Sequence, residues 1–195
     1  MNSDEFAKVL MDEGRKEWQN PKAILEQIGV SSGMTVADIA CGPGFFTLPF
    51  CEAVGPTGHV YAVDHNSVII ENLRKNITIF APSGDQIELS NIHIMEEQAS
   101  RTNIPEHSVD VIFFANVLHD IEDKRGFFQE MKRIAKSEAK FVDVDWHKRS
   151  MEMGPPLETR LSEGEARRIL KDAGLQIVHA IDAGPHHYGL VAVVI

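Results

Sequence analysis

Short apolar runs rich in Val, Ile and Phe recur along the chain and alternate with stretches of helical periodicity. The runs lack clean polar alternation, which is typical of strands that are buried on both faces of a sheet. We expect such strands at Thr35–Ala40, His59–Asp64, Asn91–Met95, Val109–Ala115 and Lys140–Asp145. Strands that alternate with helices in this way form a mostly parallel sheet with helices on both faces.

Helical stretches fill most of the intervals between these strands. We expect helices at Phe45–Val54, Ser67–Phe80, Lys124–Ala135 and Ser162–Ala173, and two more ahead of the sheet at Asp4–Trp18 and Pro21–Gly29. The stretch after Ser162 carries a capping-box pattern with Glu165 and ends at Gly174, so both of its boundaries are marked.

The last two apolar runs, Leu175–Ile181 and Gly189–Ile195, are separated only by residues 182–188. That interval is too short for a crossover helix, so the two runs must pair as an antiparallel hairpin. The predicted fold class is therefore α/β: a three-layer αβα sandwich around a seven-stranded, mostly parallel sheet with an antiparallel last strand.

The charge and cysteine content limit the partners and the compartment. The formal net charge is −10, and so acidic a surface disfavours nucleic acid and anionic membrane surfaces. Neither a signal peptide nor an apolar run near the ~20 residues of a membrane span is visible. Cys41 and Cys51 form no Cys-x-x-Cys pattern, which fits a reducing compartment. We expect a cytoplasmic protein, and a homo-oligomer stays open.

A glycine-bearing turn, Asp38-Ile-Ala-Cys-Gly-Pro-Gly44, follows the first predicted strand. Glycine lets the backbone turn sharply and lets a ligand approach closely. About 20 residues later Asp64 ends the second strand, where an acid in an open parallel sheet accepts hydrogen bonds from ribose hydroxyls. Thr47 stands where a dinucleotide site has its third glycine, and Pro43 removes an amide N–H, so a pyrophosphate is disfavoured. The pattern predicts an adenosine-type cofactor without a pyrophosphate.

These segments resemble the motifs of class I S-adenosylmethionine-dependent methyltransferases, in particular the small methyltransferases of the ubiquinone and menaquinone biosynthesis type. The resemblance covers about residues 18–140 and implies a Rossmann-like fold with S-adenosylmethionine as cofactor. Ala40 replaces the first glycine of the family's motif, and Gln98 replaces the usual acid at the adenine. The implied cofactor-binding residues are Asp38, Ala40, Cys41, Gly42, Gly44, Asp64, His65, Gln98, Ala99, Asn116 and Trp18.

The resemblance also implies how the chain is organised. Residues 1–195 are expected to form one methyltransferase domain, in which N-terminal helices (residues 1–30) cap the cofactor and residues 31–195 form the catalytic core. Trp18 is the candidate lid residue, and a half-buried packing role for it is the alternative.

Imidazole and aromatic side chains are expected where the acceptor would bind, beyond the carboxyl ends of the strands. His119 follows the fourth strand, His147 follows the fifth, and the hairpin turn brings residues 186–188 to the same edge. We predict that His119, His147 or His186 contacts or deprotonates the acceptor; loop histidines bonded to backbone or water are the alternative. No recognised metal-ligand spacing is present, so no metal is expected.

The predicted function is in-line methyl transfer to a small-molecule acceptor. A non-catalytic S-adenosylmethionine-binding protein is one alternative, and an oxidoreductase with an NAD-type cofactor is another, which Thr47 and the terminal hairpin disfavour. A quinone, a lipid, a corrinoid or another small acceptor stays open. The irregular stretch Trp146–Leu161 is a candidate lid, and Met151 and Met153 could line the acceptor or pack in the core.

Overall fold

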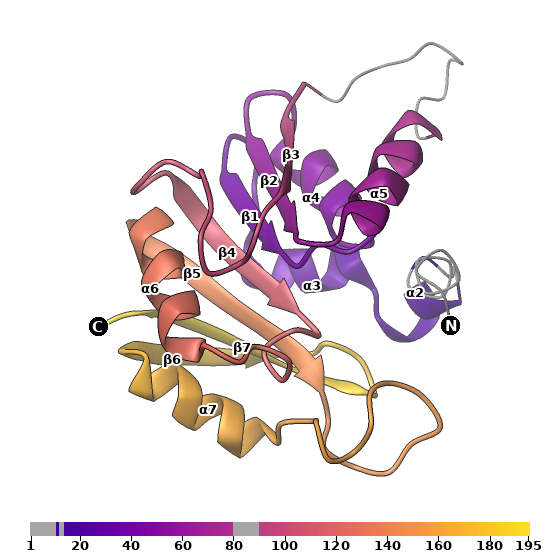
Figure 1. The fold of residues 1–195 in the computed structure, drawn as a ribbon, viewed down its shortest axis with the longest axis vertical. Coiled ribbons are helices and arrows are strands. Elements are labelled where there is room, and N and C mark those ends of the chain that lie inside the picture. The colour runs from indigo at the N-terminus through magenta and orange to yellow at the C-terminus, as the bar shows by residue number, and fades with distance from the viewer. Residues whose placement is uncertain (1–10, 12–13, 80–89) are drawn as a thin grey trace.

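A computed structural model describes residue 11, residues 14–79 and residues 90–195. Its sheet has seven strands in the order β3-β2-β1-β4-β5-β7-β6 (Figure 1). The strands are β1 (Thr35–Ile39), β2 (His59–Asp64), β3 (Ile92–Glu96), β4 (Val109–Ala115), β5 (Ala135–Trp146), β6 (Leu175–Ile181) and β7 (His187–Val194). Strands β1 to β5 pair in parallel, and β7 is antiparallel to both β5 and β6. The predicted sheet, including its reversed last strand, is confirmed.

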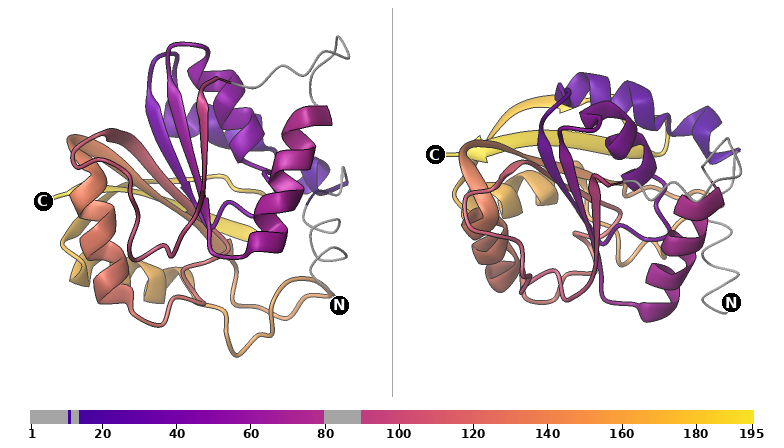
Figure 2. Two further views of the ribbon diagram at one scale, coloured as in Figure 1. Left: turned by 45° about the horizontal axis from the view of Figure 1, so that its top comes forward. Right: turned by 90° about the horizontal axis from the view of Figure 1, so that it is seen from above.

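Helices cover both faces of this sheet, as Figures 1 and 2 show. They are α2 (Arg15–Trp18), α3 (Pro21–Ile28), α4 (Thr47–Val54), α5 (Ser67–Ile79), α6 (Lys124–Ile134) and α7 (Glu163–Asp172). Helices α3, α4 and α5 lie on one face, and α6 and α7 lie on the other. The predicted capping box at Ser162 and Glu165 is present. No helix of the described residues is long and apolar enough to cross a membrane.

Three element boundaries differ from the expectation by two or more residues. Strand β5 begins at Ala135 instead of Lys140, because Ala135 already pairs with Val109 ahead of a register shift, and Lys136 Nζ donates to Asp110 at 2.7 Å. Helix α4 begins at Thr47, because the two phenylalanines before it are buried within the turn. Strand β7 begins at His187 instead of Gly189, because His187 pairs with Trp146 of β5.

The helix expected at Asp4–Trp18 is only partly visible. Its last residues form α2, whereas residues 4–10, 12 and 13 lie outside the described residues.

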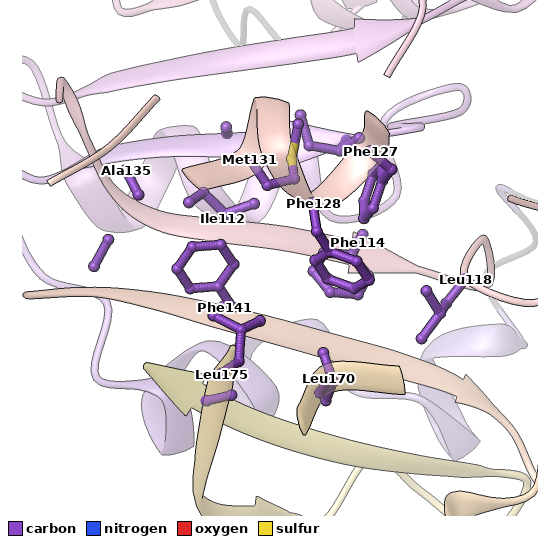
Figure 3. Packing of buried hydrophobic residues seen from close by; sticks show 14 of the residues in the cluster. Ile112, Phe114, Leu118, Phe127, Phe128, Met131, Ala135, Phe141, Leu170 and Leu175 are labelled. Atoms are coloured by element: carbon purple, nitrogen blue, oxygen red, sulfur yellow. The ribbon is translucent and has the colours of Figure 1, made fainter. Parts of the chain in front are cut away.

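One large apolar cluster fills the space between the sheet and helices α6 and α7. Figure 3 shows Phe114 of β4 against Phe127 and Phe128 of α6, and the rings of Phe114 and Phe127 meet edge to face at 5.4 Å. Each buried ring of this kind contributes about 1.5–3 kcal/mol relative to an exposed one. Phe141 of β5 belongs to this cluster and faces α6 and α7. Because successive residues of a strand face opposite sides of the sheet, Asp143 and Asp145 lie on the same face as Phe141.

Candidate active site

The carboxyl ends of the parallel strands meet at one edge of the sheet. The hairpin turn between β6 and β7 returns to this edge, because His187 at the start of β7 pairs with Trp146 at the end of β5. The edge therefore carries the turn after β1, Asp64, Asn116 and the predicted histidines. It is the place where open α/β sheets bind their ligands.

The turn after β1 has an unusual backbone. Ala40, Gly42 and Gly44 have φ values of 55°, 57° and 102°, and a left-handed backbone is uncommon for a residue other than glycine. A Cβ atom on Gly44 would come within 2.6 Å of Leu73 Cδ1, so this position needs glycine. The backbone N–H of Cys41 donates to the Val63 carbonyl at 3.0 Å, which ties the turn to β2.

Asp64 holds this turn from the neighbouring strand. Its Oδ2 accepts from the Gly42 N–H at 3.1 Å, and its Oδ1 accepts from the Asn66 N–H at 3.0 Å. Each carboxylate oxygen has a further lone pair, so Asp64 can accept from a ribose hydroxyl and keep both backbone contacts. His65 is largely exposed, and its Nδ1 lies 3.8 Å from Asp64 Oδ1.

Asp38 supports the turn from inside the protein. Its carboxylate is 2% exposed and accepts from the Thr47 hydroxyl at 2.6 Å. Burial raises the pKa of Asp38 to about 7, against the effect of the Thr47 hydrogen bond and with a further contribution from Asp64. Thr47, which the sequence showed only as a missing glycine, thus has a role of its own.

Asn116 follows β4 with a left-handed backbone, φ 60°. Its N–H donates to the Val144 carbonyl at 2.7 Å, while its buried Oδ1 has no hydrogen-bond partner among the described residues. Buried polar atoms nearly always have a partner in folded proteins. The side chain of Asn116 is therefore ready to accept a hydrogen bond from a ligand.

The predicted adenine site, Gln98 and Ala99, lies just after β3. The Gln98 carbonyl accepts from the Arg101 N–H at 2.9 Å, which closes a tight turn. The residues around an open depression of about 330 Å³ here are Glu97, Gln98, Arg101, Thr102 and Asn103. Ala99 is not among the residues that line this depression.

His119, after β4, contacts a buried carboxylate of β5. Its Nδ1 lies 2.8 and 2.9 Å from the two carboxylate oxygens of Asp145, and its side chain is 3% exposed. Burial lowers the pKa of His119, but the hydrogen bond and charge of Asp145 outweigh it, so the pKa is raised above 6.5. On the other side of the ring, Nε2 lies 3.5 Å from the exposed carboxylate of Asp120.

The sequence prediction named His119 and missed Asp145. A signal was present, because two acids alternate with valines in the otherwise apolar segment Phe141–Trp146. Charged residues in a buried strand are rarely there without a partner or a function.

The other acid of this segment, Asp143, is fully buried and has no partner for either carboxylate oxygen among the described residues. Burial, and then the charge of Asp145, raises its pKa well above the ordinary value. The hydroxyl of Tyr188, on the neighbouring strand β7, is also buried without a partner. The surroundings of Asp143 therefore favour the protonated, neutral form of this carboxyl group.

The other two predicted catalytic residues, His147 and His186, are joined to each other through their backbones. The His147 N–H donates to the His186 carbonyl at 2.9 Å. Burial, and then Arg149, lowers the pKa of His147. The three histidines thus share the edge of the sheet, but within the described residues no hydrogen bond joins His119 to the other two.

Trp18 packs on the hairpin turn with aromatic partners that the sequence placed at this edge. It stacks on His187 at 5.7 Å with an interplanar angle of 6°, and its ring lies 6.1 Å from that of Trp146. A Cβ on Gly184 would come within 1.8 Å of the Trp18 carbonyl oxygen, so the end of α2 rests directly on the turn.

The candidate lid, Trp146–Leu161, is held by one buried side chain that the sequence analysis missed. Arg160 is 3% exposed and donates to four carbonyls of this loop. These are Pro155 at 2.8 Å, Met153 at 2.7 Å, Arg149 at 3.0 Å and His147 at 3.3 Å. The loop therefore has a defined shape in the described structure.

Metal-ligating side chains do not gather at this edge. Within residues 14–79 and 90–195 no group of three or more His, Cys, Asp or Glu residues is placed to hold a metal ion.

Comparison with solved structures shows close similarity over the full chain. The structure of an S-adenosylmethionine-dependent methyltransferase from Aquifex aeolicus is 29% identical, with a TM-score of 0.90 and 100% coverage of both chains. Magnesium protoporphyrin IX methyltransferase from Synechocystis, solved with bound S-adenosylmethionine, is 18% identical with a TM-score of 0.65 and shares the fold. That match covers 89% of this chain and 76% of the other.

Curated relatives include two demethylmenaquinone methyltransferases. The protein of Oceanobacillus iheyensis is 25% identical over 143 residues, which are 73% of this chain and 56% of the relative. That of Staphylococcus aureus is 24% identical over 133 residues, 68% of this chain and 51% of the relative. This chain thus spans about half the length of these relatives.

The family described as "Methyltransferase domain" matches residues 30–182, most of the chain. This match includes every strand except β7. It also includes the turn after β1, Asp64, Asn116 and the His119–Asp145 pair. The resemblance to class I methyltransferases of the ubiquinone and menaquinone type is confirmed, and the chain belongs to the methyltransferase domain family.

Proposed function

We propose that the protein is an S-adenosylmethionine-dependent methyltransferase that acts on a small-molecule acceptor by in-line transfer. The observation that carries the proposal is the His119–Asp145 pair, which lies at the same edge of the sheet as the glycine-bearing turn. Family membership and the full-length similarity to the Aquifex aeolicus protein support it. The net charge of −10 favours a small acceptor over nucleic acid.

The residues at the turn fit this cofactor. Asp64 has free acceptor capacity for a ribose, and the orphaned Asn116 Oδ1 can accept from an ammonium group. The remaining residues proposed to bind it are Asp38, Ala40, Cys41, Gly42, His65, Gln98, Ala99 and Trp18. S-adenosylmethionine, when bound, supplies an electrophilic methyl group on a sulfonium.

We propose that His119 is the general base. With Nδ1–H donating to Asp145, the free nitrogen of the neutral ring is Nε2, which can take a proton from the acceptor. Asp145 fixes this tautomer and stabilises the imidazolium that forms. His147 and His186 are proposed to contact the acceptor, because no carboxylate among the described residues hydrogen-bonds to either ring.

The test is turnover to S-adenosylhomocysteine, measured on a panel of quinols, phenols and carboxylic acids with the wild type, His119→Ala and the control His179→Ala. His179 is exposed on β6. We expect an acceptor-dependent signal that falls about 10²–10⁴-fold for His119→Ala, as for other general bases, and stays unchanged for the control. Cofactor binding without turnover on any acceptor contradicts the proposal and favours the non-catalytic alternative.

A further inference from the structure

Four rings from three separate segments pack together at the carboxyl edge, and we call them the aromatic cluster: Trp18, Trp146, His186 and His187. Trp18 ends α2, Trp146 ends β5, His186 precedes β7 and His187 begins it. The rings of Trp146 and His187 approach to 4.1 Å, and Trp18 meets His186 edge to face at 5.3 Å. The cluster thus joins the N-terminal segment to the two strands nearest the proposed acceptor site.

Several polar atoms of this cluster are buried without a partner. Both ring nitrogens of His187, which is 2% exposed, and Nδ1 of His186 have none among the described residues. Gln19, next to Trp18, is fully buried, and its Nε2 is also unpartnered although its Oε1 accepts from Arg15 at 2.8 and 2.9 Å. A buried polar atom without a hydrogen-bond partner destabilises the folded protein. A ligand that bonds to these atoms restores part of the lost stability.

The groups with the largest electrostatic effect on His187 are basic. Burial lowers the pKa of His187 to about 3, and Arg15, His186, His147 and Arg160 lower it further. The imidazole is therefore neutral, with one N–H donor and one acceptor nitrogen, and its surroundings disfavour a cation and favour an anion.

Two buried arginines contact aromatic rings at this edge. The guanidinium of Arg15 lies 3.9 Å from the centre of the Phe45 ring, and that of Arg160 lies 5.6 Å from the centre of the Trp146 ring. The positive charges of these two arginines act on the nearby rings over a short range, because charges separated by more than about 8 Å across solvent are screened at physiological salt. The acidic residues behind the overall net charge of −10 therefore do not cancel the positive potential of the arginines at the cluster.

We propose that the aromatic cluster recognises the acceptor, and that the acceptor is a flat ring with an anionic oxygen, such as a carboxylate, to which His187 donates a hydrogen bond. The inference rests on the proposed methyltransferase function, because a cationic methyl donor also favours an anionic acceptor. Flat rings stack on indole and imidazole faces. In the free protein Trp18 stacks on His187 and occupies the position of the ligand ring, which the acceptor takes by displacing Trp18.

Trp18 is the member of the cluster that can move. It belongs to a helix of four residues, whereas Trp146 and His187 are paired with each other in the sheet. Displacement of Trp18 also exposes the buried nitrogens of His187 to the ligand. Binding is therefore expected to leave the strands in place and to increase the solvent exposure of Trp18.

Intrinsic fluorescence tests the proposal directly, because the two tryptophans of the chain both belong to the cluster. The probes are benzoate, benzamide and benzylammonium, which share a ring and differ in charge. We expect benzoate to red-shift the emission and to bind at least tenfold more tightly than benzamide, with no response to benzylammonium. Trp146→Phe should retain the red shift, because the signal comes from Trp18, and Trp18→Phe should lose it.

His187→Phe keeps a ring in the stack and removes the donor, so we expect at least a tenfold loss of benzoate affinity. His179→Phe, on the exposed face of β6, is the matched control and should keep it. If His187→Phe does not fold, His187→Gln retains a donor and should bind benzoate more tightly than His187→Leu. Equal affinity for the three probes, or an unchanged affinity in His187→Phe, overturns the proposal.

S-adenosylhomocysteine binding, measured by calorimetry on the same samples, separates the two claims. Normal binding of this compound with no fluorescence response to benzoate overturns the acceptor subsite and leaves the methyltransferase proposal intact. If the folded wild type neither binds S-adenosylhomocysteine nor changes its fluorescence with benzoate, both the methyltransferase proposal and the acceptor subsite are contradicted.

Discussion

The contact between His119 and Asp145 shows how much a single pair of residues determines in this site. The position of His119 after β4 could be predicted, because the strand pattern places the following residue at the ligand edge. Its partner could not, because the register between β4 and β5 decides which acid of β5 meets it. That register depends on a bulge near Val111, which a pattern of apolar residues does not reveal.

The first prediction concerns the pH dependence of methyl transfer. Asp145 raises the pKa of His119, and a general base acts in its neutral form, so kcat should rise with pH through this pKa. Asp145→Asn should move the rising limb to lower pH and reduce the plateau, because the tautomer is no longer fixed. Asp120→Asn, which alters an exposed carboxylate at 3.5 Å, is the control and should shift the limb less. A rising limb at the same pH in all three proteins would contradict the role of Asp145.

The second prediction concerns the stability contributed by Asp143. Its folded pKa is raised well above 3.8, so its contribution is full below the unfolded pKa and is lost as pH rises through the folded pKa. Asp143→Asn keeps a neutral group of similar shape and should raise the free energy of unfolding at pH 8 by about 1–2 kcal/mol.

Urea denaturation of wild type and Asp143→Asn at pH 5 and pH 8 measures this effect. The difference should grow with pH. Asp172→Asn, at the exposed end of α7, should show no such trend. A destabilised Asp143→Asn protein at pH 8 would show that the carboxylate is ionised and bound by a partner.

At the scale of elements, the strand ends and the terminal hairpin could be predicted and the segment between β5 and α7 could not. The hairpin followed from the short interval after Ile181, which leaves no room for a helix. The loop at residues 147–161 has no periodicity, and its shape depends on the side chain of Arg160 bonding to carbonyls far along the loop. Such side chain to backbone contacts leave no signature in the spacing of residues.

The third prediction therefore concerns Arg160. Arg160→Lys keeps the charge but cannot reach four carbonyls with the same planar group, so the loop should open more often. Trypsin cleavage after Lys148 and Arg149, followed by mass spectrometry under native conditions, measures the opening. We expect cleavage at least fivefold faster than in the wild type, and no change in Arg168→Lys, which alters an exposed arginine of α7. Equal rates in the three proteins would mean that other contacts hold the loop.

At the scale of the whole molecule, the fold places two different sets of groups at one edge of the sheet. The turn after β1, Asp64 and Asn116 form the side proposed for the methyl donor, and the His119–Asp145 pair with the aromatic cluster forms the side proposed for the acceptor. The donor side could be predicted because its residues lie at fixed points of a recognisable motif. On the acceptor side the sequence placed His119, His147 and His186 at this edge, but it could not show that Trp18 stacks on His187 or that His119 contacts Asp145, because these contacts form only in the folded chain.

The central claim is that this edge binds S-adenosylmethionine, and thermal unfolding with added ligand tests it most directly. A ligand that binds only the folded state raises the midpoint of unfolding. We predict that S-adenosylmethionine and S-adenosylhomocysteine raise the Tm of the wild type, that Asp64→Ala reduces this shift more than Asp172→Ala does, and that NAD has no effect. A rise in Tm with NAD and none with either adenosyl compound would contradict the account.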